Sequence, residues 1–445
     1  MPEKYPLIKV TPPGPKAEAI LEKDSKYISP SSARAYPLVV KRAKGVMVED
    51  VDGNRYLDFT SGVAVCNTGH CHPAVVKAIA QQAKELLHMS GADFFNPLQI
   101  ELAQKLDEAC PGPSPKRVFF SNSGAESVET ALKLVRYHTK RPLVIAFANA
   151  FHGRTMGALS LTGSKPVQRK GFSPLVPGVI HVPYAYCYRC PYGVTHPREE
   201  LACIRWIEEE LFKTYVPPEE VAAVFVEPIQ GEGGYIVPPK AFIKDLSTLC
   251  KKYGILLVAD EVQSGMGRTG KMLAIEHFDA VPDVICLAKG IASGLPLGAT
   301  VAREEIMDWP PGAHASTFGG NPLSSRAALV TLELLKRGLV ENAAKIGSYL
   351  LEELNKLLPR HPLIGEVRGK GLMIGIELVK DKETKERAGE ERETVVKRAF
   401  QKGLLLLGCG KNTIRFAPPL TITKKDADTA LSIFDEALRA VGKGK

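Results

Sequence analysis

Short runs of consecutive apolar residues alternate with longer amphipathic stretches through the middle of the chain. Most of these runs are apolar at nearly every position and end in glycine or polar residues. Strands with this pattern are buried on both faces, as in a mostly parallel sheet that is covered by helices. The rhythm therefore predicts an α/β fold. The predicted strands are residues 116–124, 142–149, 221–228, 254–262, 282–290 and 297–302.

The region before this block shows two local signals. Asp52 and Gly53 stand between two apolar runs and predict a hairpin turn. Residues 72–88 have the amphipathic pattern of a helix, and Pro73 is placed to open it.

The region after the block predicts a second, smaller α/β domain. A long helical pattern covers residues 325–358, and the tail alternates strand, helix, strand and helix, with its strands in 361–379 and 412–420. We expect three parts, an N-terminal segment that packs with the small domain, a large cofactor-binding domain and a small C-terminal domain. Their expected limits are 1–75, 76–335 and 336–445.

Bulk composition narrows the class of protein. The chain has 445 residues, of which 44% are hydrophobic and 24% are charged. This length suits two packed domains and an enzyme. No apolar run approaches the roughly 18 to 20 residues of a membrane span, and the first residues do not resemble a signal peptide. We therefore expect a cytoplasmic protein that does not cross a membrane.

Charge and cysteine content exclude further classes. The formal net charge is +9, but Lys and Arg are scattered, so we expect no nucleic-acid partner. A mild positive field suits an anionic cofactor or carboxylate substrates. Nine cysteines without a dense pattern indicate reduced thiols, and the scarcity of Gln beside abundant Lys and Glu favours a thermophilic source.

Candidate chemistry lies at the ends of the predicted strands, where open α/β sheets place their sites. Asp260 and Glu261 end one buried strand, and Lys289 ends the next, 29 residues after Asp260. Taken alone, such an acid and base would be read as a structural salt bridge.

A third strand end changes that reading. The strand that ends near residue 121 is followed by Ser123, Gly124 and Ala125 and then by a helical pattern. Backbone N–H groups at the N-terminus of a helix bind phosphate, so this turn predicts a phosphate cup. A phosphate cup, an acid and a lysine would then meet at one sheet edge.

Several blocks of the sequence resemble those of class III aminotransferases, in the same order and over about residues 30 to 425. They are SNSGAESVETALKLVR, AFHGRT, EPIQGEGGY, VADEVQSGMGRTG, DVICLAKGIASGLPLGA, STFGGNP and RGKGLMIGIEL. The resemblance implies fold type I, with a large mostly parallel mixed sheet and a smaller C-terminal α/β domain, and it implies the cofactor pyridoxal 5′-phosphate (PLP).

The resemblance also implies roles around the cofactor ring. Lys289 is similar to the Schiff-base lysine, which also moves the proton during catalysis. Asp260 is similar to the aspartate that keeps the ring nitrogen protonated. Gln263 resembles the residue that reaches the phenolic oxygen, and Val262 the residue that packs on one ring face.

Further cofactor contacts follow from the same likeness. Phe151 resembles the aromatic residue that stacks on the other ring face, His152 belongs to the tight turn after it, and Glu227 is assigned to the cofactor site. Thr317 is similar to a threonine that reaches the cofactor phosphate of the neighbouring subunit. This implies a homodimer, or a dimer of dimers, whose sites are shared between chains.

Two arginines are expected to bind substrate carboxylates, for which the guanidinium fork is suited. Arg415 resembles the arginine that takes an α-carboxylate or turns to Glu232 when the other substrate binds. Arg154 resembles the partner of the distal carboxylate of 4-aminobutyrate or 2-oxoglutarate.

Two residues give opposite indications of the amino donor. Val63 stands where ornithine-specific members have a tyrosine, which favours 4-aminobutyrate. Asp93 lies in a segment that reaches the partner's pocket in this family, where a carboxylate would hold the distal ammonium of ornithine. A helix cap is the slightly favoured interpretation of Asp93.

One pair of cysteines resembles part of a metal site. Cys187 and Cys190 have the spacing of zinc ligands, and His181 and His196 are near in sequence. No second cysteine pair follows, so we expect no metal and interpret the pair as buried thiols.

Together these features predict a PLP-dependent aminotransferase that acts on amino-acid and 2-oxo-acid substrates. It would move an amino group from 4-aminobutyrate or ornithine to 2-oxoglutarate by a ping-pong mechanism. The alternative is an amino-acid racemase on the same scaffold, because reprotonating the same carbanion from the opposite face needs no new cofactor.

Overall fold

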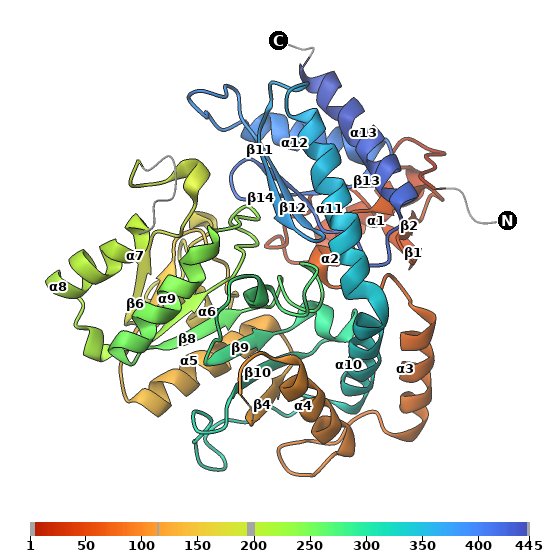
Figure 1. The fold of residues 1–445 in the computed structure, drawn as a ribbon. Helices are drawn as coiled ribbons and strands as arrows, with labels where there is room; N and C mark the ends of the chain where they lie inside the picture. Colours follow the sequence, from red (N-terminus) through yellow and green to blue (C-terminus); the bar gives the residue numbers. More distant parts are fainter. Residues whose placement is uncertain (1–4, 114, 194–200, 443–445) are drawn as a thin grey trace.

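The structure, a computed structural model, describes residues 5–113, 115–193 and 201–442. A seven-stranded sheet lies at the centre of its larger part (Figure 1). Its strands are β4 (Lys116–Ser121), β5 (Leu143–Phe147), β6 (Val179–Val182), β7 (Val221–Val226), β8 (Leu256–Asp260), β9 (Val284–Leu287) and β10 (Gly298–Arg303). They are ordered β4-β10-β9-β8-β7-β5-β6. Only β10 pairs antiparallel with its neighbours, so the predicted mostly parallel sheet is confirmed.

Helices cover both faces of this sheet. Those of the larger part are α3 (Pro73–Glu85), α4 (Pro97–Ala109), α5 (Gly124–Thr139), α6 (Met156–Leu161), α7 (Ala202–Trp206), α8 (Phe212–Thr214) and α9 (Lys240–Tyr253). Along β5, Val144 and Ala146 pack into the core under α5 and α6, whereas Ile145 and Phe147 pack into the core under α9. This two-sided burial explains why the strands are apolar at consecutive positions.

The C-terminal part has its own four-stranded antiparallel sheet. Its strands, in spatial order, are β11 (Ile364–Lys370), β12 (Met373–Leu378), β15 (Thr413–Phe416) and β14 (Leu407–Cys409). Helices α12 (Gly389–Gln401) and α13 (Lys424–Gly442) complete it. The expected single strand over residues 361–379 is wrong, because the chain reverses at Gly371 and forms the β11–β12 hairpin. Gly371 has φ +52 and allows the tight turn.

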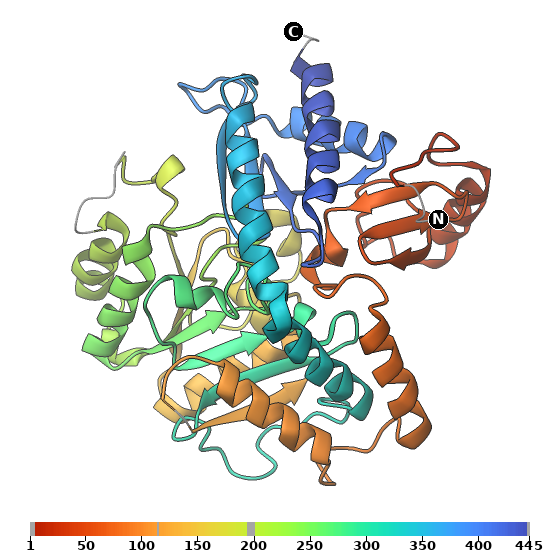
Figure 2. The ribbon, with the colours of Figure 1, turned by 45° about the vertical axis from the view of Figure 1, so that its right-hand side comes forward.

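The N-terminal residues pack beside the C-terminal part. After α1 (Pro15–Tyr27), strands β1 (Val40–Lys44), β2 (Met47–Asp50) and β3 (Arg55–Asp58) form a small sheet. The turn between β2 and β3 contains Gly53 at φ +88, which confirms the predicted hairpin. Strand β13 (Leu404–Leu405) pairs in parallel with β3, and Figure 2 shows this sheet beside α13.

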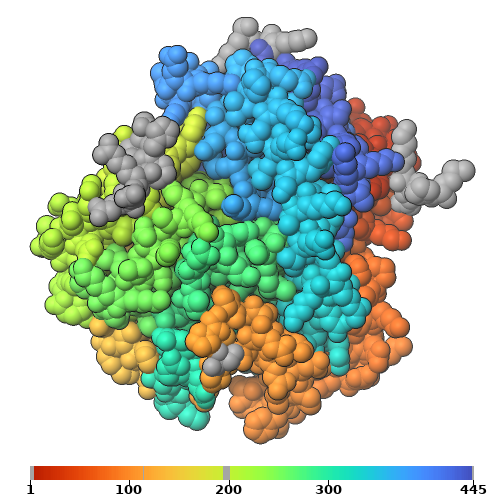
Figure 3. Space-filling model, in the orientation of Figure 1, coloured from red at the N-terminus to blue at the C-terminus, as the bar shows by residue number. Residues whose placement is uncertain are grey.

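A long helical segment connects the two larger parts. Helix α10 (Pro322–Leu334) continues through a π-helical turn at Leu335–Leu339 into α11 (Val340–Leu357). Gly338, at φ +136, interrupts the helical geometry within that turn. In Figure 3 the segment runs in cyan over the surface from the upper to the lower part of the molecule.

One buried arginine joins segments that are distant in sequence. The guanidinium of Arg268 donates to the carbonyl oxygens of Leu372 and Pro418 and to Oδ1 of Asn67 (2.6 Å). Its side chain is fully buried. The N-terminal, central and C-terminal segments therefore meet around one cation that donates to both backbone and side-chain oxygens.

No helix within the described residues is long and apolar enough to cross a membrane.

Candidate active site

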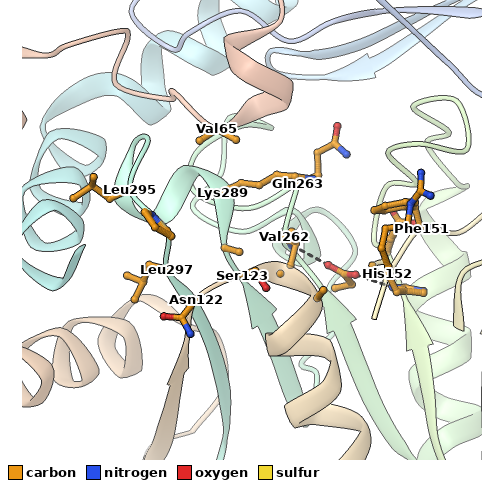
Figure 4. Close-up of a pocket in the computed structure, with 18 of the residues that line it drawn as sticks. Val65, Asn122, Ser123, Phe151, His152, Val262, Gln263, Lys289, Leu295 and Leu297 are labelled. Atoms are coloured by element: carbon orange, nitrogen blue, oxygen red, sulfur yellow. Dashed lines mark hydrogen bonds and ion pairs between the residues drawn. The ribbon is translucent and has the colours of Figure 1, made fainter. Parts of the chain in front are cut away.

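A cavity of about 580 Å³ opens at one edge of the central sheet (Figure 4). Strands β4, β5, β7, β8 and β9 end at this edge, and the loop that leads into the antiparallel strand β10 completes it. The predicted site residues that line the cavity are Ser123, Gly124, Ala125, Phe151, His152, Arg154, Glu227, Asp260, Val262, Gln263 and Lys289. The structure therefore brings together residues from five strand ends.

Asp260, the last residue of β8, is fixed by two hydrogen bonds. Its Oδ2 lies 2.7 Å from Nδ1 of His152, and its Oδ1 accepts from the backbone N–H of Val262 (3.0 Å). Burial opposes a charge on His152, but the hydrogen bond and charge of Asp260 outweigh it and raise the pKa of the imidazole. The carboxylate is thus held in one orientation at the cavity.

Lys289 follows β9 and extends across the cavity toward Gln263 in Figure 4. Its backbone has φ +49, a conformation that residues other than glycine rarely adopt. Burial lowers the pKa of its amine, and the carboxylate of Asp260 only partly opposes this effect. A lowered pKa increases the neutral fraction of the amine, which is the form that attacks a carbonyl.

The predicted phosphate cup is the N-terminus of α5. Ser123 caps the helix by accepting from the backbone N–H of Glu126 (3.2 Å), which leaves the first N–H groups without partners in the helix. A Cβ at position 124 would lie 2.6 Å from a side-chain methyl of Val262, so glycine lets the helix start pack closely against the β8 end. Helix dipole and free N–H groups favour an anion here.

Phe151 and Glu227 form the opposite wall. Glu227, buried at the end of β7, accepts from the backbone N–H of Phe151 (2.9 Å) and from that of Gly231 (2.8 Å). Burial raises the pKa of Glu227. The carboxyl group fixes the backbone that carries the aromatic ring, so it acts on the cavity through Phe151.

The side chain of Gln263 is likewise held by a buried residue behind it. The hydroxyl of Tyr235 donates to its side-chain oxygen (2.9 Å), and the Tyr235 ring is fully buried. This bond leaves the side-chain amide of Gln263 available as a donor toward the cavity.

Arg415 and Glu232 meet as predicted, although neither lines the cavity itself. Nη1 of Arg415 donates to Oε2 of Glu232 (3.2 Å), and both charges act on the amine of Lys289. Lys165 makes a second ion pair to Oε1 of Glu232 (2.7 Å). No sequence motif indicated Lys165, because its partner lies 67 residues away in the chain.

Arg154 stands at the mouth of the cavity. Its side chain is exposed, and its guanidinium carbon lies 5.5 Å from the centroid of the Phe151 ring. The distance and exposure leave this cation free to turn toward a ligand.

Besides Arg415 and Glu232, three more predicted residues do not line the cavity of this chain. Thr317 is exposed, and Val63 is half-buried in a left-handed turn. Asp93 is exposed and accepts from the hydroxyl of Ser90 (2.7 Å). The interpretation of Asp93 as a helix cap is wrong, because Asn96 caps α4.

The cavity also contains residues that the sequence did not single out. They are Val65, Asn122, Ala288, Gly294, Leu295, Pro296 and Leu297. The stretch 294–297 adjoins the Lys289 motif, and its position beside the lysine follows from the antiparallel direction of β10. The sequence pattern did not indicate that β10 runs antiparallel, so it did not place these residues at the cavity.

The cysteine pair lies on the insertion after β6. Cys187 and Cys190 are free and half-buried, not fully buried as expected. His181 lies 3.2 Å from the carbonyl oxygen of Leu161, and His196 is outside the described residues. Within the described part of the chain, no group of three His, Cys, Asp or Glu residues has the arrangement of a metal site.

These residues fit PLP in charge and shape. The N-terminus of α5 offers N–H donors for a phosphate, Asp260 offers an anion for a ring nitrogen, and Lys289 offers an amine. Val262 and Phe151 add apolar side chains to the lining, against which a ring could pack. The absence of a Cβ at Gly124 keeps room for the side chain of Val262, which lines the cavity beside the helix.

Comparison with known proteins identifies the family. The model of the class III aminotransferases matches residues 28–438. The chain is 41% identical to an alanine/serine racemase of Pyrococcus horikoshii, covering 99% of this chain and 94% of that protein. It is 39% identical to a probable 4-aminobutyrate aminotransferase of Bacillus subtilis, covering 94% of this chain and 97% of that protein.

A solved structure agrees with these matches. The PLP-bound amine transaminase of an uncultivated Pseudomonas species superposes with a TM-score of 0.86 at 35% identity, covering 94% of this chain and 99% of that chain. The chain therefore belongs to the class III aminotransferase family, has the fold type I architecture and takes pyridoxal 5′-phosphate as its cofactor.

Proposed function

We propose that this protein transfers an amino group from 4-aminobutyrate or ornithine to 2-oxoglutarate by a ping-pong mechanism. The observation that carries the proposal is the ion pair of Arg415 with Glu232 beside Lys289, together with the exposed Arg154 at the cavity mouth. Two separated guanidinium groups match the two carboxylates of a dicarboxylic oxo acid.

The residues around the ring would divide the chemistry. PLP supplies the electron sink that stabilises negative charge on the substrate carbon next to the amino group. In our proposal Asp260 keeps a proton on the ring nitrogen, and His152 holds Asp260 in place. The amine of Lys289 removes the proton from the substrate carbon and returns it to the other side of the C=N system.

The arginine pair would adapt the pocket to two substrates. With 4-aminobutyrate, Arg415 stays on Glu232 and Arg154 takes the single carboxylate. With 2-oxoglutarate, Arg415 leaves Glu232 for the α-carboxylate and Arg154 takes the distal one. Val63 lies outside the cavity of this chain, so its small apolar side chain supports 4-aminobutyrate only through the family resemblance, and Asp93 would support ornithine if the partner subunit presents it to the site.

A panel of amino donors with 2-oxoglutarate tests this function. We expect glutamate to form fastest with 4-aminobutyrate or ornithine, and single-turnover bleaching of the cofactor absorbance by those donors without an oxo acid. Donors that leave the absorbance unchanged, with no glutamate formed, would contradict the proposal.

Racemisation of an α-amino acid is the second candidate. It is supported by the 41% identity to the Pyrococcus horikoshii alanine/serine racemase over nearly the whole of both chains. A racemase would convert a single L-amino acid to the D form without any oxo acid. Chiral analysis of such an incubation separates the two functions, because a transaminase gives bleaching without D product.

We also propose that two chains form the active unit. Residues 86–95 and Phe318 expose apolar side chains at one place, where the rings of His88 and Phe318 lie 4.7 Å apart. Phe95 is 100% exposed and Phe318 60%. An exposed apolar patch of this kind is typical of an interface, and Thr317 and Asp93 lie on the same two segments.

Light scattering tests the dimer. The wild type is expected at twice the chain mass, and Phe95→Asp is expected to shift the protein toward the monomer with loss of PLP affinity. Val167→Asp, at an exposed apolar position elsewhere (75% exposed), serves as the control. A monomeric wild type with full activity would contradict the shared site.

A further inference from the structure

Glu232 lies between two cations and gives one carboxylate oxygen to each. Oε1 is 2.7 Å from the ammonium of Lys165, and Oε2 is 3.2 Å from Nη1 of Arg415. The Lys165 side chain is 40% exposed, that of Glu232 18% and that of Arg415 9%. The lysine therefore approaches from solvent and the arginine from the interior.

This division weakens the hold of Glu232 on Arg415. A guanidinium binds a carboxylate most strongly through two parallel bonds, but here Lys165 occupies the second oxygen. Nε of Arg415 is buried and has no hydrogen-bond partner among the described residues. A buried donor of this kind is costly unless a ligand satisfies it.

We propose that Lys165 is a positioning residue that holds Glu232 in place when Arg415 leaves it for the α-carboxylate of a substrate. The proposal rests on the carboxylate-binding role proposed for Arg415. Lys165 directly precedes the short helix Pro166–Gln168, which follows α6 in the chain. Its ammonium reaches Glu232 from outside the cavity.

Two physical effects make the lysine necessary. When Arg415 leaves, Glu232 would otherwise remain largely buried without a cation, and an unpaired buried charge is strongly unfavourable. Without Lys165, both oxygens of Glu232 would also be open to a bidentate bond from Arg415. Both effects raise the free energy that an α-carboxylate must supply to capture the arginine.

The test compares substrates with and without an α-carboxylate in the holoenzyme. Lys165→Met is expected to raise KM for 2-oxoglutarate, and Kd for glutamate from absorbance titration, about 5- to 20-fold. KM for 4-aminobutyrate should change less than about 2-fold. Lys165→Arg should restore most of the loss, and Lys170→Met, at an exposed position on the same segment, should behave as wild type.

A double-mutant cycle gives the decisive outcome. In a Glu232→Gln background no charge needs to be held, so adding Lys165→Met should not change Kd for glutamate further. Equal changes for both substrate classes, no change for either, or an undiminished effect in the Gln background would overturn the proposal. If wild type fails to transaminate but binds glutamate, the proposed function fails while the cycle still tests Lys165.

Discussion

The cofactor side and the substrate side of the cavity differ in how their charged groups are held. On the cofactor side, both oxygens of Asp260 and both oxygens of Glu227 have partners, and backbone N–H groups supply three of these four bonds. On the substrate side, Arg415 makes one side-chain bond and Arg154 is exposed.

The difference fits the roles that we propose for the two sides. A ring that is held for every turnover needs fixed donors and acceptors, and the ends of strands in a packed sheet provide them. A pocket that alternates between two substrates needs a charge that can change partners. A buried arginine with a single side-chain bond, such as Arg415, and an exposed arginine, such as Arg154, meet that need, at the cost of a less defined geometry.

The largest effect is expected at Lys289 on the cofactor side. Lys289→Ala should reduce kcat by at least about 10⁴-fold because, among the residues that the structure describes, no other lysine lines the cavity to move the proton. The variant should still bind PLP through the helix N-terminus, which dialysis followed by absorbance would measure. Turnover close to wild type would remove Lys289 from the mechanism.

A smaller loss is expected from neutralising the carboxylate at β8. Asp260→Asn keeps the shape but removes the charge, so kcat should fall about 10²- to 10³-fold. The imidazole of His152 should lose its raised pKa at the same time, because Asp260 causes that shift. Titration of His152 by NMR checks this, and an unchanged pKa would contradict the coupling.

On the substrate side, an arginine substitution should affect binding more than chemistry. Arg415→Gln should raise KM for 2-oxoglutarate about 100-fold, as expected when one partner of a buried carboxylate pair is lost. The single-turnover rate constant with 4-aminobutyrate should stay within about 5-fold of the wild-type value. A kcat loss as large as that of Asp260→Asn would place Arg415 on the cofactor side of the comparison.

Glu261, the neighbour of Asp260, should make the free energy of unfolding depend on pH. Burial raises the pKa of Glu261 to about 7, so the folded protein holds a proton that the unfolded chain releases near pH 4.5. The free energy of unfolding should therefore fall as pH rises from about 5 to 7.5. Glu261→Gln should reduce this fall by about 2 kcal/mol in urea titrations. An identical slope in both proteins would contradict the assignment.

The smallest effect concerns the backbone at the substrate side. Ser61, Gly62, Val63 and Ala64 all have φ between +46 and +66, and a β-branched residue is strained there. Val63→Gly should raise the free energy of unfolding by up to about 1 kcal/mol. Val65→Gly, where φ is −99, should lower it. Destabilisation of equal size by both would show that strain at Val63 is negligible.

The sequence alone determined much of the fold and the cofactor side. Strands buried on both faces must be apolar at consecutive positions, so β5, β7, β8, β9 and β10 were visible in the sequence, and the half-buried edge strand β4 was visible from its apolar run. Asp260, Lys289 and the Ser123 turn end such strands, and the ends of parallel strands meet at one edge. Strand β6 was missed because it is short and contains His181.

Only the tertiary structure decided the rest. The β11–β12 hairpin depends on one turn at Gly371, and the sequence prediction ran a single strand through that position. The partners of Glu232 come from residues 165 and 415, and no local pattern records a contact between segments so far apart. Periodicity reports which face of an element is buried, whereas pairing between distant side chains depends on how the elements pack.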